Sequence, residues 1–222
     1  MISLVIAESS LELVPKNIQN HPAIISHARK LGKNTSEILL DNSWHFAAMK
    51  GIENEIKRGR PDLVHFCLLE ACTIPLFFEN KLQIFIHTIN NKVIRVHEQV
   101  NIPKSYHRFA GLVEQLFFEK LIHGDGRTLL DIHDMSLSEL LEKIKPSKVI
   151  GVSVKGNKSS YQEVAQKFED NSCLVVGGFQ KGHFSETTKN CLNELYSVDI
   201  KSLEAHVVIS RILYEYEKTI FM

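Results

Sequence analysis

The chain has no excess of either charge: 26 Lys and Arg balance 26 Asp and Glu, so the formal net charge at pH 7 is zero. Proteins that bind nucleic acid usually carry a basic excess. Any RNA-binding surface must therefore come from local basic clusters that acidic residues balance elsewhere. The chain also lacks an apolar run of the roughly 18 residues that a membrane span needs. Residues 1–7 lack the basic start and the length of a signal peptide, so we expect a cytoplasmic protein without a membrane segment.

Cysteine is scarce and irregularly spaced, with four residues at positions 67, 72, 173 and 191. No two of them form a C-x-x-C pair, so neither a zinc site nor a disulfide framework is supported. We expect them to be small buried side chains. The 11 histidines are scattered. A stretch rich in His and Asp, residues 122–134, reads as a glycine-containing loop without helical i, i+4 pairing, so we predict no metal site.

With 222 residues, 44% hydrophobic and 23% charged, the chain has the size of one elaborated α/β domain. Short apolar or alternating runs predict strands, two of them joined through Asn90-Asn91 as a hairpin, at residues 3–7, 82–88, 93–96 and 149–153. Periodic apolar positions predict helices within 18–31, over 44–49, from 61, from 101 to about 122 and over 136–144. Pro22 can begin the first of these helices.

The stretch from residue 173 to 205 reads as strand, glycine turn, helix, strand, loop and helix. An apolar run, Cys173–Val176, leads into Gly177 and Gly178, which let the backbone turn sharply and come close to a ligand. Phe179 and Gly182 follow. Ser185 then opens a helix, residues 192–196 form a second apolar run, 197–202 form a loop and Leu203 begins a last helix. Loops at the carboxyl ends of strands are where open sheets usually bind ligands, although ordinary βα turns would look the same.

A helix start at residues 60–62 admits two interpretations. Pro61 suits the first helical position, and Asp62 suits the positive end of the helix dipole, with Arg60 as its ion-pair partner. The same pair could instead carry chemistry. Apolar residues that follow are expected on one face of the helix, namely Leu63, Phe66, Cys67 and Ala71.

A second helix start combines basic and aromatic residues. Lys104, His107 and Arg108 surround Tyr106, and Phe109 follows. This composition suits phosphate contact combined with base stacking, and a solvated helix start is the alternative.

Residues 151–159 have the glycine spacing of a phosphate-binding loop. Asn157, however, shifts Lys158 and Ser159 one place out of register. We therefore do not expect a nucleoside triphosphatase.

Four motifs in register carry a family resemblance. They are Arg60-Pro61-Asp62-x-x-His65, Ile86-His87-Thr88, Ile102-Pro103-Lys104-x-x-x-Arg108-Phe109-x-Gly111-Leu112 and Val175-Val176-Gly177-Gly178-Phe179-x-x-Gly182. Together they resemble the SPOUT-superfamily ribosomal RNA pseudouridine N1-methyltransferases, whose members also serve small-subunit assembly. The resemblance spans roughly residues 60–217, and the compact chain looks like an archaeal member. It departs from the pattern where Lys104 replaces an arginine, Ser202 a proline and Ile200-Lys201 a more polar pair, which puts side-chain contacts to the cofactor in doubt.

The resemblance implies a single SPOUT domain over residues 1–222, with a sheet flanked by helices, a C-terminal trefoil knot and a family-specific hairpin around 80–100. It implies S-adenosylmethionine-dependent N1-methylation of a pseudouridine in small-subunit ribosomal RNA by a homodimer, with ribosomal assembly proteins as further partners. Asp62 would accept or orient the N1 proton, and Arg60 would fix Asp62 or hold phosphate. Arg60, Lys104, His107 and Arg108 would bind RNA. The cofactor would lie on groups around Gly177, Gly178, Phe179, Gly182, Leu195, Ser197, Ile200 and Leu203.

Two other functions stay open from the sequence. An RNA-binding assembly factor could keep the fold while methyl transfer is secondary or lost. A different SPOUT specificity, guanosine N1 or ribose 2′-O, is disfavoured by the helix start at residues 60–62 and by the motif over 104–111.

Overall fold

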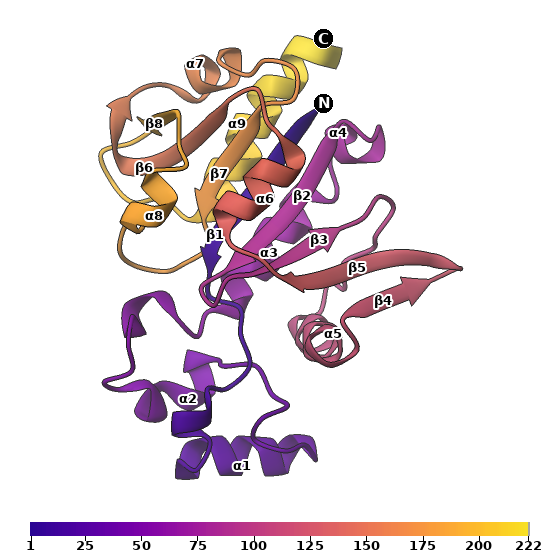
Figure 1. Ribbon diagram of the computed structural model, residues 1–222, viewed down its shortest axis with the longest axis vertical. Coiled ribbons are helices and arrows are strands. Elements are labelled where there is room, and N and C mark those ends of the chain that lie inside the picture. The colour runs from indigo at the N-terminus through magenta and orange to yellow at the C-terminus, as the bar shows by residue number, and fades with distance from the viewer. Residues whose placement is uncertain (222) are drawn as a thin grey trace.

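The computed structural model describes residues 1–221, in which eight strands form one mixed sheet in the order β4-β5-β3-β2-β1-β7-β6-β8 (Figure 1). Strands β2, β1, β7, β6 and β8 run parallel, and β3, β5 and β4 continue the sheet antiparallel. The strands are β1 Ile2–Ser9, β2 Leu82–Thr88, β3 Lys92–Val96, β4 Leu121–Gly124, β5 Arg127–Asp134, β6 Val149–Lys158, β7 Cys173–Gly177 and β8 Glu194–Ser197.

The strand β1 lies at the centre and is buried along its whole length. It pairs with β2 on one side and β7 on the other, so its backbone groups are satisfied in both directions. Leu4 and Ile6 join the larger core cluster, whereas Val5 and Ala7 join the smaller one on the opposite face. A near-continuous apolar strand covered on both faces is what a parallel sheet requires.

Helices cover the two faces unequally (Figure 1). The larger cluster packs under α3 Pro61–Ala71, α4 Pro75–Phe78, α5 Tyr106–Glu119, α7 Tyr161–Gln166 and α9 Ala205–Phe221. The opposite face carries α6 Leu137–Ile144 and α8 Glu186–Lys189. The predicted α/β sheet flanked by helices is therefore confirmed.

No helix within residues 1–221 combines the length and the apolar character that crossing a membrane takes.

Residues 10–60 form an N-terminal lobe below the carboxyl end of β1 (Figure 1). It contains α1 Pro22–Leu31, α2 Asn42–Met49 and the 3-10 turns Lys16–Ile18 and Glu55–Lys57, around a small apolar core of its own. Polar contacts fasten the lobe to α5. The backbone N–H of Leu39 donates to Glu114 Oε1 at 2.9 Å, and Tyr106 Oη donates to Asp41 Oδ2 at 2.5 Å.

Several expected boundaries are wrong. The helix α5 ends at Glu119 rather than near Ile122, because Lys120 adopts a left-handed conformation and residues 121–124 then form a strand. The stretch 122–134 belongs to the β4–β5 hairpin, with a tight turn at Asp125-Gly126, and is not a loop. The final helix starts at Ala205 instead of Leu203.

Four further expectations need correction or refinement. Phe66 is 45% exposed and lies beside His206, so it does not share the buried face of α3. The hairpin around 80–100 is part of the main sheet, since β2 pairs in parallel with β1. Cys191 is half-buried, whereas the other cysteines are buried as expected. Residues 151–158 continue β6 as a strand, which leaves no phosphate-binding loop there.

The buried His45 of α2 makes stability depend on pH. Burial and the neighbouring His27 lower the pKa of His45 from 6.5 to about 4. Between these values the unfolded chain binds a proton that the folded chain refuses, so the free energy of unfolding falls as pH drops through this window. We expect wild-type protein to lose on the order of 1 kcal/mol more than a His45→Gln variant between pH 7 and 5 in urea denaturation. Replacing the exposed His123 by Gln is the control; an equal pH slope in all three proteins would contradict the assignment.

Candidate functional site

A pocket of about 500 Å³ opens at the carboxyl ends of β7 and β8, beside residues 152–154 in the middle of β6. Its walls come from residues 152–154, 176–177, 179–184, 197–199 and 201–205, with Leu63 of α3 and Val208 of α9. The volume falls within the range of small-molecule sites, and the position is where open parallel sheets bind ligands. This pocket is therefore the candidate ligand site.

The predicted cofactor residues divide into two groups. Those in the pocket wall are Gly177, Phe179, Gly182, Ser197 and Leu203. Those outside it are Gly178, Leu195 and Ile200. Leu195 pairs with Gly151 inside the sheet, and Ile200 is 82% exposed on the loop before α9.

Gly178 and Gly182 each need to be glycine, but for different physical reasons. Gly178 donates its N–H to Ala7 O at 2.8 Å and accepts from the N–H of Ser10 at 2.9 Å, so both of its backbone groups are used within the protein. A Cβ at Gly178 would lie 2.3 Å from Ser9 Oγ, which makes it a packing glycine. Gly182 has φ +108°, a backbone conformation that residues other than glycine rarely adopt.

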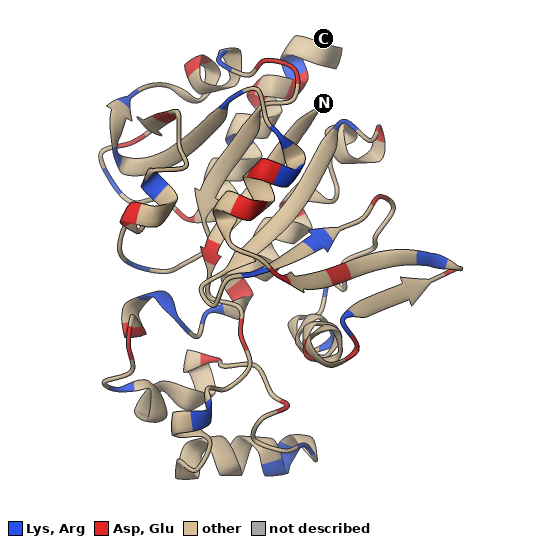
Figure 2. Cartoon of the chain, viewed as in Figure 1, with Lys and Arg blue, Asp and Glu red and all other residues tan. Residues whose placement is uncertain are grey.

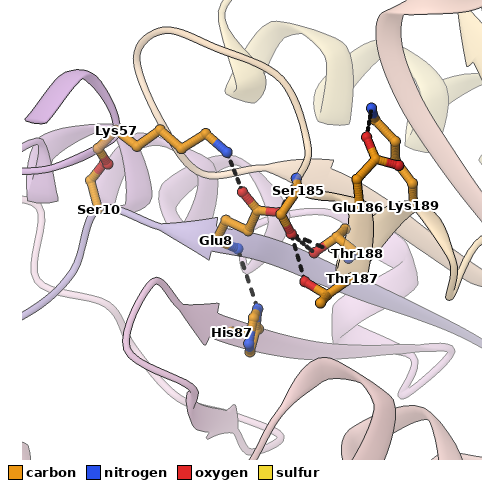
Figure 3. Close-up of polar contacts among 9 residues, drawn as sticks. All are labelled: Glu8, Ser10, Lys57, His87, Ser185, Glu186, Thr187, Thr188 and Lys189. Carbon is orange, nitrogen blue, oxygen red and sulfur yellow. Dashed lines mark hydrogen bonds and ion pairs between the residues drawn. The ribbon is translucent and has the colours of Figure 1, made fainter. Parts of the chain in front are cut away.

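A buried carboxylate, that of Glu8 at the end of β1, fixes the loop before α8 (Figure 3). Its Oε1 accepts hydrogen bonds from the N–H of Ser185 at 2.7 Å and from Ser185 Oγ at 2.8 Å. Its Oε2 accepts from Lys57 Nζ at 2.5 Å. The Glu8 backbone is left-handed, with φ +50°, and its N–H donates to His87 Nδ1. One side chain thus joins the central strand, the N-terminal lobe and the segment that forms the pocket wall.

The ammonium group of Lys57 also supports the pocket wall directly. It lies 4.5 Å from the ring centroid of Phe179, a cation–π contact, and Phe179 packs edge-on against Phe184. Burial alone would raise the pKa of Glu8, but the hydrogen bonds from Lys57, Ser185 and Thr188 outweigh it and lower that pKa below 4.5. Glu8 is therefore a permanent anion at neutral pH.

The predicted pair Arg60 and Asp62 forms a bidentate ion pair, with both N–O distances 2.8 Å, at the start of α3. Both side chains stay partly exposed. The hydrogen bond to Asp62 raises the pKa of Arg60, and the charges of Glu204 and Asp41 add to this effect. Glu204 belongs to the pocket wall, as does Leu63, the residue after Asp62. The pair consequently lies beside the pocket. The same ion pair, at the first turn of α3, also fits the helix-start interpretation.

The basic start of α5 is joined to α3. His65 Nε2 donates to Pro103 O at 2.7 Å, and the His65 ring stacks on Phe109 with centroids 4.4 Å apart. Lys104, His107 and Arg108 are exposed around this junction. The structure thus brings the motifs at residues 60–65 and 102–112 together.

Sequence reasoning did not identify Glu8 and Lys57, nor the charged side chains of the pocket wall, Lys181, His183, Asp199, Lys201 and Glu204. One signal was available. Glu8 follows a run of apolar residues in a strand that reads as buried, and a charge in such a place needs a specific partner.

The fold and the pocket define an α/β protein whose ligand site lies where parallel strands end. Its structure matches the crystal structure of Archaeoglobus fulgidus Nep1 bound to S-adenosylhomocysteine, with TM-score 0.88, 35% identity and 97% of each chain covered. A family model for EMG1/NEP1 methyltransferases matches residues 4–217. The chain belongs to this family, which confirms the resemblance.

Two relatives illustrate the likeness over the full length. The ribosomal RNA small subunit methyltransferase Nep1 of Thermococcus sibiricus is 40% identical over 219 residues, with 98% of each chain covered. The protein of the same name from Sulfurisphaera tokodaii is 42% identical over 219 residues, covering 96% of this chain and 94% of the relative.

The Glu8 contacts predict an unequal response to the loss of two carboxylates. Glu8→Gln leaves the largely buried Lys57 without its anion, so we expect a loss of about 3 kcal/mol in the free energy of unfolding at pH 7. Glu186→Gln removes an exposed pair with Lys189 and should change little. Because the folded-state pKa of Glu8 is lowered, its contribution is present above pH 4.5 and disappears as pH falls through the folded value. Urea denaturation of both variants measures this, and equal stabilities would contradict it.

Proposed function

We propose that the protein transfers a methyl group from S-adenosylmethionine to N1 of a pseudouridine in small-subunit ribosomal RNA and so supports small-subunit biogenesis. The observation that carries the proposal is the pocket at the ends of β7 and β8, which lies beside the Arg60–Asp62 ion pair. The chain that holds this arrangement is 35% identical, over 97% of its length, to a Nep1 that binds S-adenosylhomocysteine.

The residues of the pocket fit the proposed cofactor. S-adenosylmethionine supplies a methyl group that its positively charged sulfur activates. Apolar wall residues such as Val152 and Phe179 offer surface to a flat base, and the absence of side chains at Gly177 and Gly182 leaves backbone groups accessible. Carboxylates and ammonium groups in the same wall suit a ligand that carries both an ammonium and a carboxylate; they belong to Lys181, Asp199, Lys201 and Glu204. We propose that backbone groups of residues 177, 179–182, 197–199 and 201–203 hold the cofactor.

Asp62 is the residue proposed to act on the nucleophile, which is N1 of the pseudouridine. Pseudouridine has an N1–H, whereas in uridine that nitrogen carries the sugar. Arg60 holds both carboxylate oxygens of Asp62 in one plane, and each oxygen keeps a lone pair for a further hydrogen bond. In the proposed mechanism the target base leaves its stack, and Asp62 accepts or orients the N1 proton so that the nitrogen faces the methyl group.

The RNA backbone has a proposed path over the start of α5. Lys104, His107 and Arg108 are exposed there, and the His65 contacts tie that helix start to the Arg60–Asp62 pair. Contacts of basic side chains with phosphate position an RNA without reading its sequence. In this proposal the pocket, and not the basic start of α5, recognises the base.

A homodimer, a knotted C-terminal segment, a cytoplasmic location and ribosomal assembly proteins as partners stay predictions of the family resemblance. Support for a dimer comes from apolar side chains that the single chain leaves exposed, among them Phe66 at 45% and Tyr214 at 52%. Beside Phe66, the buried His206 Nδ1 has no hydrogen-bond partner within residues 1–221.

The test uses labelled S-adenosylmethionine and two small-subunit RNA hairpins that differ only by uridine or pseudouridine in the loop. We expect label in the pseudouridine hairpin alone. Label in both, or on ribose or guanosine, would replace the proposed specificity by another. Label in neither, with both hairpins bound tightly, would identify an RNA-binding assembly factor.

Replacing Asp62 tests its role within the reaction. We expect Asp62→Asn to lower the single-turnover rate by about 100-fold, because the amide cannot accept the N1 proton as a carboxylate does. Binding of S-adenosylhomocysteine and of the hairpin should stay near wild type. Asp134→Asn, an exposed carboxylate on β5, is the matched control. A full rate in Asp62→Asn with RNA bound would leave Asp62 as a helix-start residue only.

A further inference from the structure

We propose that Trp44, with His27 and Lys30, is a stacking platform for an unpaired base of the RNA, next to the proposed RNA path over the start of α5. This inference rests on the proposed function, since it assumes an RNA substrate. Trp44 is the single tryptophan of the chain, and 47% of its surface is exposed. An exposed tryptophan within a rigid, basic surface calls for a partner with a flat apolar face.

Two side chains of α1 contact the Trp44 ring. The rings of His27 and Trp44 lie almost parallel, with centroids 4.6 Å apart and an interplanar angle of 11°. Lys30 Nζ lies 5.0 Å from the Trp44 centroid. Proteins hold unpaired bases on aromatic faces, and a nearby cation adds attraction for the phosphate.

Hydrogen bonds hold the stack in one state. The N–H of Asp41 donates to His45 Nδ1 at 3.0 Å, so the proton of neutral His45 is on Nε2. That proton is donated to His27 Nδ1 at 2.9 Å, which places the remaining proton of His27 on Nε2. Burial lowers the pKa of both histidines, and both rings are therefore neutral at pH 7. A rigid platform loses little conformational entropy when a base binds.

The platform borders the proposed RNA path. Asp41 caps α2, and Trp44 lies in the first turn of that helix. The same Asp41 accepts a hydrogen bond from Tyr106, which begins α5 between Lys104 and Arg108. The Asp41–Tyr106 hydrogen bond therefore joins the first turn of α2, which carries Trp44, to the start of α5 on the proposed RNA path.

Charge favours RNA over a protein partner or a second copy of the chain. Neither α1 nor α2 contains an acidic residue, whereas α1 carries Arg29 and Lys30 near its C-terminal end. Figure 2 shows the same segregation, with blue and no red along the α1 ribbon. This is one of the local basic clusters that a chain of zero net charge needs to bind RNA.

Because Trp44 is the only tryptophan, its fluorescence reports the platform directly. The probes are the pseudouridine hairpin and a fully paired duplex of equal length. We expect the hairpin to quench the fluorescence at saturation and the duplex to bind with little quenching. Trp44→Leu should weaken hairpin binding, measured by anisotropy, about tenfold, while Trp44→Phe should largely restore it. Duplex and S-adenosylhomocysteine binding should not change in either variant.

The outcomes separate this inference from the proposed function. Hairpin binding by wild-type protein without quenching, together with unchanged binding by Trp44→Leu, overturns the platform and leaves the methyl transfer intact. A Trp44→Leu protein that changes only its sedimentation assigns the surface to a second copy and also overturns the inference. Wild-type protein that binds neither RNA overturns both proposals. Equal melting temperatures of the variants exclude misfolding as the cause.

Discussion

The buried carboxylate of Glu8 is the constraint on which the candidate site depends. It lies at the end of the central strand and takes hydrogen bonds from Lys57 and from Ser185, which are far apart in the sequence. Removing a carboxylate from water is costly, and only several donors in good geometry offset that cost. The cationic partner Lys57 then packs on Phe179 of the pocket wall and lies three residues before Arg60. One charge pair thus holds the pocket wall and the proposed catalytic ion pair on a common frame.

This frame arranges the proposed functions along one surface. The pocket lies at the ends of β7 and β8, and the Arg60–Asp62 pair lies beside it. The His65 junction connects that pair to the basic start of α5. Asp41 then connects α5 to the lobe that carries Trp44. Cofactor site, nucleophile site and RNA surface therefore share rigid connections, which suits a reaction whose main demand is alignment.

Local patterns predicted much of this fold because they were strong and unbroken. The buried strands β1 and β7, the β2–β3 hairpin and the helix start at Pro61 follow from apolar runs and turn chemistry. The β4 and β5 strands were missed because glycines and polar residues interrupt their alternation. Gly178 resembled a ligand-binding glycine, but its close approach to Ser9 is a tertiary contact that no local pattern reveals. The role of Glu8 was not predicted for the same reason, since its partners come from distant segments.

The most direct test of this account is hydrogen exchange at backbone amides with and without S-adenosylhomocysteine. The account predicts slower exchange in residues 177–184 and 197–205 when the ligand binds, and unchanged exchange in the β4–β5 hairpin. In Glu8→Gln the amides of 177–184 should exchange faster even without ligand, because their anchor is lost. The account would be contradicted if the ligand slowed exchange only outside residues 177–184 and 197–205. It would also be contradicted if residues 177–184 exchanged at the wild-type rate in Glu8→Gln.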